Sequence, residues 1–135
     1  MKRKYLLDTN HLSAAMAPVS RVRDRIIQTH RAGHKFGAPL PVICELEAGI
    51  RLLGDLPAAR RQLQWIFTKV SIWPMDLTHC QTYGEIFHRL REAGRVLSQV
   101  DMMIAAMAQD MNLIVLTSDR DFEALLDIRT ENWTA

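Results

Sequence analysis

The sequence has no long apolar run and few cysteines. Charged residues interrupt each apolar stretch well before the roughly 20 residues that a membrane-spanning helix requires, so no membrane helix is expected. The N-terminus begins with basic residues, as signal peptides do, but its apolar stretch ends at Leu7, directly before Asp8. We therefore expect a protein that is not secreted and acts in the cytoplasm.

The two cysteines, Cys44 and Cys80, show neither a C-x-x-C pattern nor the Cys/His spacing of a zinc site. Both fall in segments with helical patterning. We expect them to be reduced, buried thiols, which gives no support for a disulfide scaffold or a thiolate metal centre.

A strong charge excess is also absent, because 17 Lys and Arg residues face 15 Asp and Glu residues, a net charge of +2. This balance permits nucleic-acid binding but does not by itself indicate it. Many cations lie in the first quarter of the chain: Lys2, Arg3, Lys4, Arg21, Arg23, Arg25, Arg31 and Lys35. A solvated helix face would explain that cluster equally well.

The chain shows no repeat and no low-complexity or linker-like stretch. Its 135 residues, 48% of them hydrophobic, suit one compact domain over residues 1–135. The patterns predict the order β-α-α-β-α-α-β-α-α-β-α-β, with strands at residues 4–9, near 36, at 70–75, at 113–116 and near 128. Strands that alternate with helices favour a parallel sheet covered on both faces, a three-layer α/β sandwich.

Two acids follow predicted strands. Asp8 ends the first strand, and Asp119 lies just beyond the strand at residues 113–116. Ligands of open parallel sheets collect at the carboxyl ends of the strands, so these acids are candidates for a site. Each of them could instead simply cap the helix that follows.

The acids of the predicted helix after Pro41 differ in their surroundings. Glu47 is expected to pair with Arg51 at i+4 on a solvated face. Glu45 shares its face with Val42 and Gly49, so we expect a buried carboxylate that needs a partner, a metal or a shifted pKa.

Asp101 repeats this pattern, in line with Ile104 and Ala108 on a helix that Ser98 can cap. The alternative is an ordinary first-turn acid that the helix dipole stabilises.

Four carboxylates from four separate segments would repel one another unless a cation lies between them. Mg²⁺ and Mn²⁺ prefer carboxylate oxygen, and with such ligands they support phosphodiester hydrolysis by activating water. The residues in this set are Asp8, Glu45, Asp101 and Asp119.

Four segments resemble the successive motifs of PIN-domain ribonucleases, in particular toxins of the VapC type. They are residues 5–10 (YLLDTN), 44–49 (CELEAG), 101–106 (DMMIAA) and 116–122 (LTSDRDF). The resemblance implies a five-stranded parallel sheet in which the strands before Asp8 and Asp119 are neighbours.

The same resemblance assigns an acidic core to Asp8, Glu45 and Asp101, with Asp119 as a more variable fourth acid and Asp121 in reserve. These residues would hold Mg²⁺ or Mn²⁺ and cleave single-stranded or structured RNA.

Asn10 and Thr117 flank the acids. They could hydrogen-bond a carboxylate or a metal-bound water, or they could cap the helices that follow.

The resemblance also implies a toxin with a cognate antitoxin, and a homodimer. We expect the antitoxin to wrap apolar helix surface near Trp65 and Trp73, although these residues could equally be core. The alternatives are a housekeeping RNA-processing nuclease and an inactive RNA- or protein-binding module. A phosphatase that forms an aspartyl phosphate is less favoured, because Asn10 occupies the place of its second aspartate.

Overall fold

The computed structural model describes residues 1–134, so only position 135 of the expected domain lies outside the description. The elements in chain order are β1 (Lys4–Leu7), α1 (Thr9–Met16), α2 (Arg21–Arg31), β2 (Lys35–Ala38), α3 (Leu40–Leu52), α4 (Pro57–Ile66), β3 (Val70–Ile72), α5 (Leu77–Glu92), α6 (Gln99–Met111), β4 (Ile114–Leu116), η1 (Arg120–Ala124) and β5 (Arg129–Glu131). The predicted order is confirmed, and the last helix, η1, is a short 3-10 helix.

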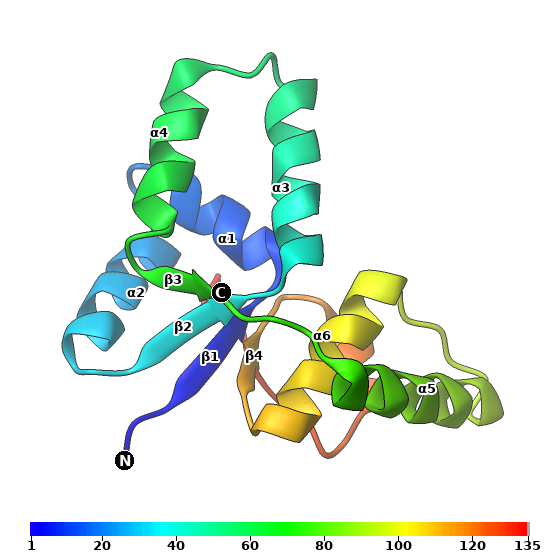
Figure 1. Ribbon diagram of the computed structural model, residues 1–135. Helices are drawn as coiled ribbons and strands as arrows, with labels where there is room; N and C mark the ends of the chain where they lie inside the picture. The colour runs from blue at the N-terminus through cyan, green and yellow to red at the C-terminus, as the bar shows by residue number, and fades with distance from the viewer. Residues whose placement is uncertain (135) are drawn as a thin grey trace.

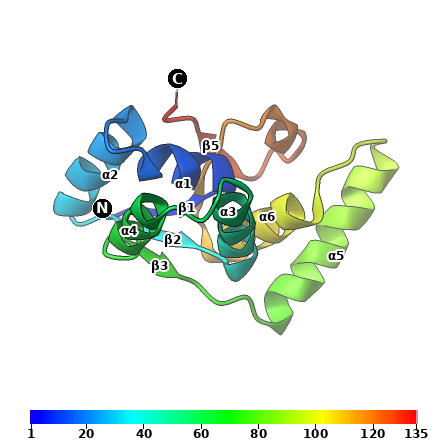
Figure 2. The ribbon, with the colours of Figure 1, turned by 90° about the horizontal axis from the view of Figure 1, so that it is seen from above.

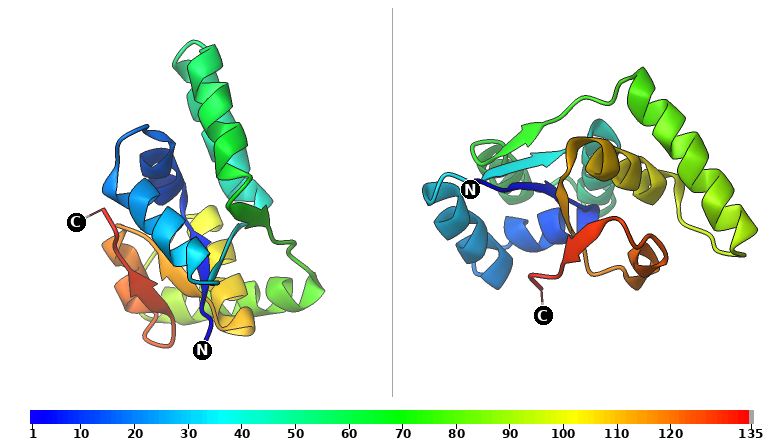
Figure 3. Two further views of the ribbon diagram at one scale, coloured as in Figure 1. Left: turned by 90° about the vertical axis from the view of Figure 1, so that its left-hand side faces the viewer. Right: turned by 90° about the horizontal axis from the view of Figure 1, so that it is seen from below.

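The five strands form one parallel sheet in the order β3-β2-β1-β4-β5. Helices α1 and α2 lie on one side of it, and α5 and α6 lie on the other (Figures 2 and 3). Helices α3 and α4 stand side by side and project from the sheet (Figure 1). The expected three-layer α/β sandwich with a five-stranded parallel sheet is therefore confirmed.

The core follows from the central position of β1 and β4. All three residues of β4 are buried, as are the last three of β1, because helices cover both faces of these strands. The strand β3 lies at the edge of the sheet, where Pro74 shortly after it costs no ladder hydrogen bond. None of the helices within residues 1–134 combines the length and apolar character that a bilayer crossing needs.

Side-chain caps fix where the helices start. The Ser20 hydroxyl accepts from the Arg23 N–H at 2.9 Å, and that of Ser98 accepts from the Asp101 N–H at 3.1 Å. At α5 the cap is Asp76. The Ser98 cap places Asp101 in the first turn of α6, as the sequence predicts.

Trp65 and Trp73 are half-buried and pack against the core. The Arg23 guanidinium lies 3.7 Å from the centre of the Trp65 ring, and a Cβ atom at Gly37 would fall 2.1 Å from the Trp73 ring. Gly37 thus allows the indole to approach the backbone of β2. The chain itself covers much of both rings, so neither is the open apolar surface expected for a partner.

Both cysteines are free but exposed, so the prediction of buried thiols is wrong. Cys44 and Cys80 lie on α3 and α5 at positions that face outward, and the helical pattern around them did not separate the two faces.

The sheet order creates a switch point between β1 and β4. From β1 the chain proceeds outward through β2 to β3, and it then returns to add β4 and β5 on the other side of β1. The connections on the two sides therefore lead away from each other at the carboxyl ends of β1 and β4, the place where sheets of this topology form a ligand-binding crevice. Asp8 and Asp119 follow these two strand ends.

Candidate active site

Asp8 is 5% exposed and follows directly after β1. Its backbone N–H donates to the carbonyl of Leu116 at 3.1 Å, which ties the ends of β1 and β4 together. Its carboxylate caps α1 by accepting from the His11 N–H at 2.9 Å. The capping role expected as an alternative is therefore real, and it also fixes the carboxylate in the crevice.

His11 lies entirely inside the protein beside this carboxylate. Its Nε2 accepts from the backbone N–H of Trp133 at 3.0 Å, which leaves the proton of a neutral ring on Nδ1. That Nδ1 lies 3.3 Å from Asp8 Oδ1 and, among the described residues, makes no hydrogen bond of full geometry. The ring is thus a buried polar group aimed at Asp8, a contact that sequence reasoning missed although His11 is i+3 from Asp8 on a helix.

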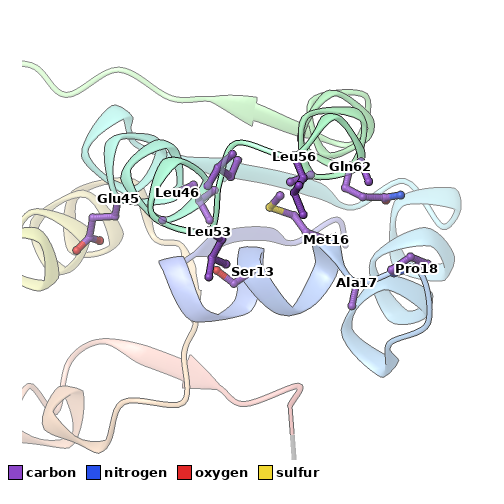
Figure 4. A pocket seen from close by; sticks show the side chains of 13 residues that line it. Ser13, Met16, Ala17, Pro18, Glu45, Leu46, Leu53, Leu56 and Gln62 are labelled. Atoms are coloured by element: carbon purple, nitrogen blue, oxygen red, sulfur yellow. The ribbon is translucent and has the colours of Figure 1, made fainter.

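Glu45 comes to the same place from α3. The Thr9 hydroxyl donates to Glu45 Oε1 at 2.5 Å, so this carboxylate lies beside the residue that follows Asp8. The side chain points away from Leu46 and Leu53 towards the ribbon of α6 (Figure 4). Glu45 is exposed, so its expected burial is wrong, because the side chain reaches along the surface to Thr9 instead of into the core.

Glu47 behaves differently from its neighbour. It forms an ion pair with Arg60, and not with Arg51 as expected. Arg60 also donates to Asp55 at 2.7 Å, because the turn after α3 brings α4 back alongside it. Glu47 therefore joins α3 to α4 and takes no part in the acidic crevice.

Asp101 and Asp119 are coupled. Burial raises the pKa of Asp101 to about 6, and the charges of Asp119 and Asp8 and a hydrogen bond with Asp119 act in the same direction. The hydrogen bond to Ser98 opposes this rise in pKa. Asp8 and Asp119 therefore lie close enough to Asp101 for their charges to disfavour its ionisation.

The turn after β4 sets the position of Asp119. The buried Thr117 hydroxyl accepts from the Asp119 N–H at 3.0 Å, and the Asp119 carboxylate accepts from the Asp121 N–H at 2.9 Å. Asp121 and Asn10 are exposed. Thr117 thus shapes the turn, and Asp119 caps η1 while it faces Asp101.

The donor set suits a hard cation. Within residues 1–134, no three His, Cys, Asp or Glu side chains already form a group that could hold a metal ion. The four acids nevertheless converge on the crevice from four elements, with carboxylate oxygens as donors and a raised pKa at Asp101 that a positive charge would lower. The residues present therefore fit a divalent cation such as Mg²⁺ or Mn²⁺.

A pocket of about 430 Å³ adjoins this site between α1, α3 and α4 (Figure 4). Its walls are mainly apolar, with Met16, Leu46 and Ile50 among them, and Glu45 is also part of its lining. Leu53 and Leu56 line it as well and are 81% and 59% exposed. This pocket leaves apolar surface open beside Glu45, whereas the chain itself covers much of Trp65 and Trp73.

Residues 5–126 match the family model of the PIN domain. That segment covers most of the chain and contains all four acids. The chain therefore belongs to the PIN-domain family.

The relatives narrow this assignment. The chain is 31% identical over 131 residues to "Ribonuclease VapC2" of Haemophilus influenzae, which covers 96% of this chain and 98% of that protein. The chain is thus a PIN-domain protein that is similar to a VapC ribonuclease, as the sequence motifs predict.

Two solved structures support the fold. VapBC2 from Rickettsia felis, bound to a DNA fragment from its promoter, has a TM-score of 0.86 at 20% identity, with 96% of this chain and 98% of that chain covered. VapBC-5 from Mycobacterium tuberculosis, a member of the VapBC family of toxin-antitoxin systems, has a TM-score of 0.67 at 22% identity, with 96% and 98% covered.

Proposed function

We propose that this protein hydrolyses single-stranded or structured RNA with Mg²⁺ or Mn²⁺ at the carboxyl ends of β1 and β4. The residues that would hold the ions are Asp8, Glu45, Asp101 and Asp119. The observation that carries the proposal is the proximity of Asp101 to Asp119 and Asp8. Burial raises the pKa of Asp101 to about 6, and the charges of Asp119 and Asp8 act in the same direction. A half-buried carboxylate that faces two other acids is a site prepared for positive charge.

When bound, the ions would supply an activated water and offset charge on the phosphodiester. The chain contributes the orientation. The Thr9 hydroxyl donates to one Glu45 oxygen. The backbone N–H of His11 donates to Asp8 Oδ1, and the His11 ring lies beside the same oxygen. Thr117 holds the turn that carries Asp119. Asp121 is exposed and remains the reserve ligand.

We further propose that the protein is the toxin of a toxin-antitoxin pair and acts in the cytoplasm. The antitoxin would place apolar side chains in the pocket between α1, α3 and α4, because Leu53 and Leu56 are exposed there and Glu45 is part of its lining. A partner seated in it would reach the acidic crevice. A homodimer is the assembly that we expect.

Chelation tests the metal-dependent step. With EDTA, cleavage of single-stranded RNA should stop, and either Mg²⁺ or Mn²⁺ should restore it. The melting temperature should rise with the ion that restores cleavage, because that ion binds the folded chain. Cleavage that is unchanged in EDTA contradicts the proposal, and the absence of cleavage with any divalent ion favours an inactive binding module.

Substitutions in the pocket test the partner. Co-expression with the protein encoded by the neighbouring gene should give a stable complex of low ribonuclease activity. Leu53→Asp should weaken that complex, whereas Leu126→Asp is the matched control, because Leu126 is 95% exposed and lies outside the pocket lining. Equal weakening by both variants, or no complex at all, contradicts the proposed docking.

A further inference from the structure

Six of the eight cations in the first quarter of the chain form two groups in the fold. The guanidinium of Arg23 lies 3.7 Å from the centre of the Trp65 ring, and that of Arg25 lies 4.2 Å from that of Trp133. These two arginines are engaged in packing. The second group is Lys2, Arg3, Lys4 and Lys35, which gathers where β1 and β2 begin.

The strand register sets like charges beside each other. Lys4 pairs with Lys35 across the parallel strands β1 and β2, and both side chains are exposed. Neighbouring like charges on adjacent strands disfavour the sheet unless a counter-charge is present. The amino ends of the strands therefore carry an electrostatic cost that an anion would relieve.

The backbone that carries these side chains is well anchored. The Arg3 N–H donates to His34 Nδ1 at 2.8 Å, and the Lys35 N–H donates to the Arg3 carbonyl at 3.0 Å. The side-chain ammonium of Lys2 also donates, to the backbone carbonyl of Ala32. The cations are thus presented by a fixed edge and not by a loose tail.

A pocket of about 550 Å³ opens at the same edge, between β1, β4 and β5. Its cationic lining residues are Lys2, Arg3, Lys4 and Arg129, and none of the described residues that line it is acidic. Glu131 Oε2 lies 4.0 Å from the Arg129 guanidinium and offsets part of one charge. The pocket therefore retains a net positive charge.

We infer that this basic edge, defined as Lys2, Arg3, Lys4, Lys35 and Arg129, binds phosphates of the RNA backbone away from the cleaved bond. The inference rests on the proposed function, because that function identifies the bound polyanion as RNA. A row of cations across several strands suits successive phosphates, whereas a single small anion would engage one or two of them.

The strands separate the basic edge from the acids. β1 has four residues and spans about 13 Å from Lys4 to the Asp8 end, so one nucleotide cannot occupy both places. RNA must extend past the catalytic crevice to reach the lysines. The contribution of the basic edge to binding should therefore depend on the length of the RNA.

The test uses the full chain in EDTA, so that binding is measured without cleavage. Lys4→Gln/Lys35→Gln is compared with Arg61→Gln/Arg91→Gln, which removes the same charge at exposed positions on α4 and α5. Affinity is measured by fluorescence anisotropy over a range of salt concentrations, with RNA of about 30 nucleotides and with a dinucleotide, which is too short to span from the basic edge to the acids.

For the long RNA, the lysine variant should bind more weakly and its slope of log K against log salt should fall in magnitude by about 1.4, since two contacts are lost. The control should keep the wild-type slope, and the dinucleotide, whose single phosphate cannot contact a row of cations, should show at most about half of this change. An equal slope for wild type and the lysine variant, or an equal change in both variants, overturns the inference. A small-anion site would also overturn it: inorganic phosphate would then raise the melting temperature of the wild type but not of the lysine variant, while the RNA slopes stay equal.

Failure of the proposed function looks different. If no divalent ion restores cleavage but the salt slope changes as expected, the basic edge stands and the metal mechanism fails. If cleavage of the dinucleotide is metal-dependent and equal in all three proteins while the long-RNA slopes do not differ, the mechanism stands and the basic edge fails.

Discussion

The two ends of the same short strands carry opposite charges. At the carboxyl ends of β1 and β4, Asp8 and Asp119 face Asp101, whose pKa is raised to about 6. At the amino ends of β1 and β2, Lys4 and Lys35 stand side by side. Repulsion between like charges destabilises both ends of the strands, the acidic end when no cation is bound and the basic end when no anion is bound. Although the net charge is only +2, negative charge gathers at one end of these strands and positive charge at the other.

The largest effect should come from Asp8→Asn at the acidic end. Cleavage should fall by about a hundredfold or more, which is some 2.7 kcal/mol of transition-state stabilisation. Asparagine is as good a helix cap as aspartate, and it relieves repulsion, so the melting temperature in EDTA should stay equal or rise. A clear loss of stability with cleavage intact would show that Asp8 is only a cap.

Glu45 and Glu47 provide a matched pair within one helix. Glu45→Gln should lower cleavage by about tenfold or more, since a ligand to the ions is lost. Glu47→Gln should leave cleavage near the wild-type level and cost about 0.2–1 kcal/mol of stability through the pair with Arg60. Parallel RNA cleavage and melting assays decide this, and equal loss of cleavage in both variants would contradict the geometry.

His11→Gln tests the support behind Asp8. Loss of a group that orients a ligand should weaken the affinity for Mn²⁺ by about tenfold. Titration calorimetry measures that affinity, and the melting temperature in EDTA serves as the control. A lower melting temperature with unchanged Mn²⁺ affinity would show that His11 only anchors Trp133.

The smallest effect concerns pH. The pKa of Asp101 lies above its ordinary value of 3.8, so the proton is favoured in the folded state. Its contribution to stability is complete below pH 3.8 and is lost as the pH rises through about 6. The melting temperature of the wild type in EDTA should therefore fall over this window relative to Asp101→Asn, and Mg²⁺ should reduce the difference. Parallel curves for the two proteins would show that Asp101 is not coupled to the other acids.

The fold could be predicted because its signals are local. Ser20 and Ser98 mark helix starts, and the apolar run at residues 113–116 suits a central strand with helices on both faces. Asp8 and Asp119 could be placed for the same reason, since each follows a strand directly. Helix phase likewise separated Glu45 from Glu47.

The rest depended on contacts between distant segments. The helical periodicity indicates the face of α3 on which Glu45 lies, but it does not indicate how deeply the side chain is buried. The exposure of Glu45 and its hydrogen bond with Thr9 were therefore missed. Glu47 has Arg51 at the ideal spacing, yet the fold of α4 onto α3 offers Arg60 instead. His11 lies only three residues after Asp8, but the Trp133 N–H that fixes its ring is 122 residues away, so nothing near it in the sequence indicated that the ring is buried.

That last contact constrains the order in which a nascent chain can mature. Asp8 and His11 are synthesised long before Trp133, which lies 122 residues beyond His11 and whose backbone N–H holds the imidazole. Strand β5, which leads to Trp133, can pair only after β4 has been added beside β1. The crevice that we propose as the catalytic centre is therefore complete only after Trp133 has been synthesised and β5 has paired, so a copy translated only as far as β4 lacks it.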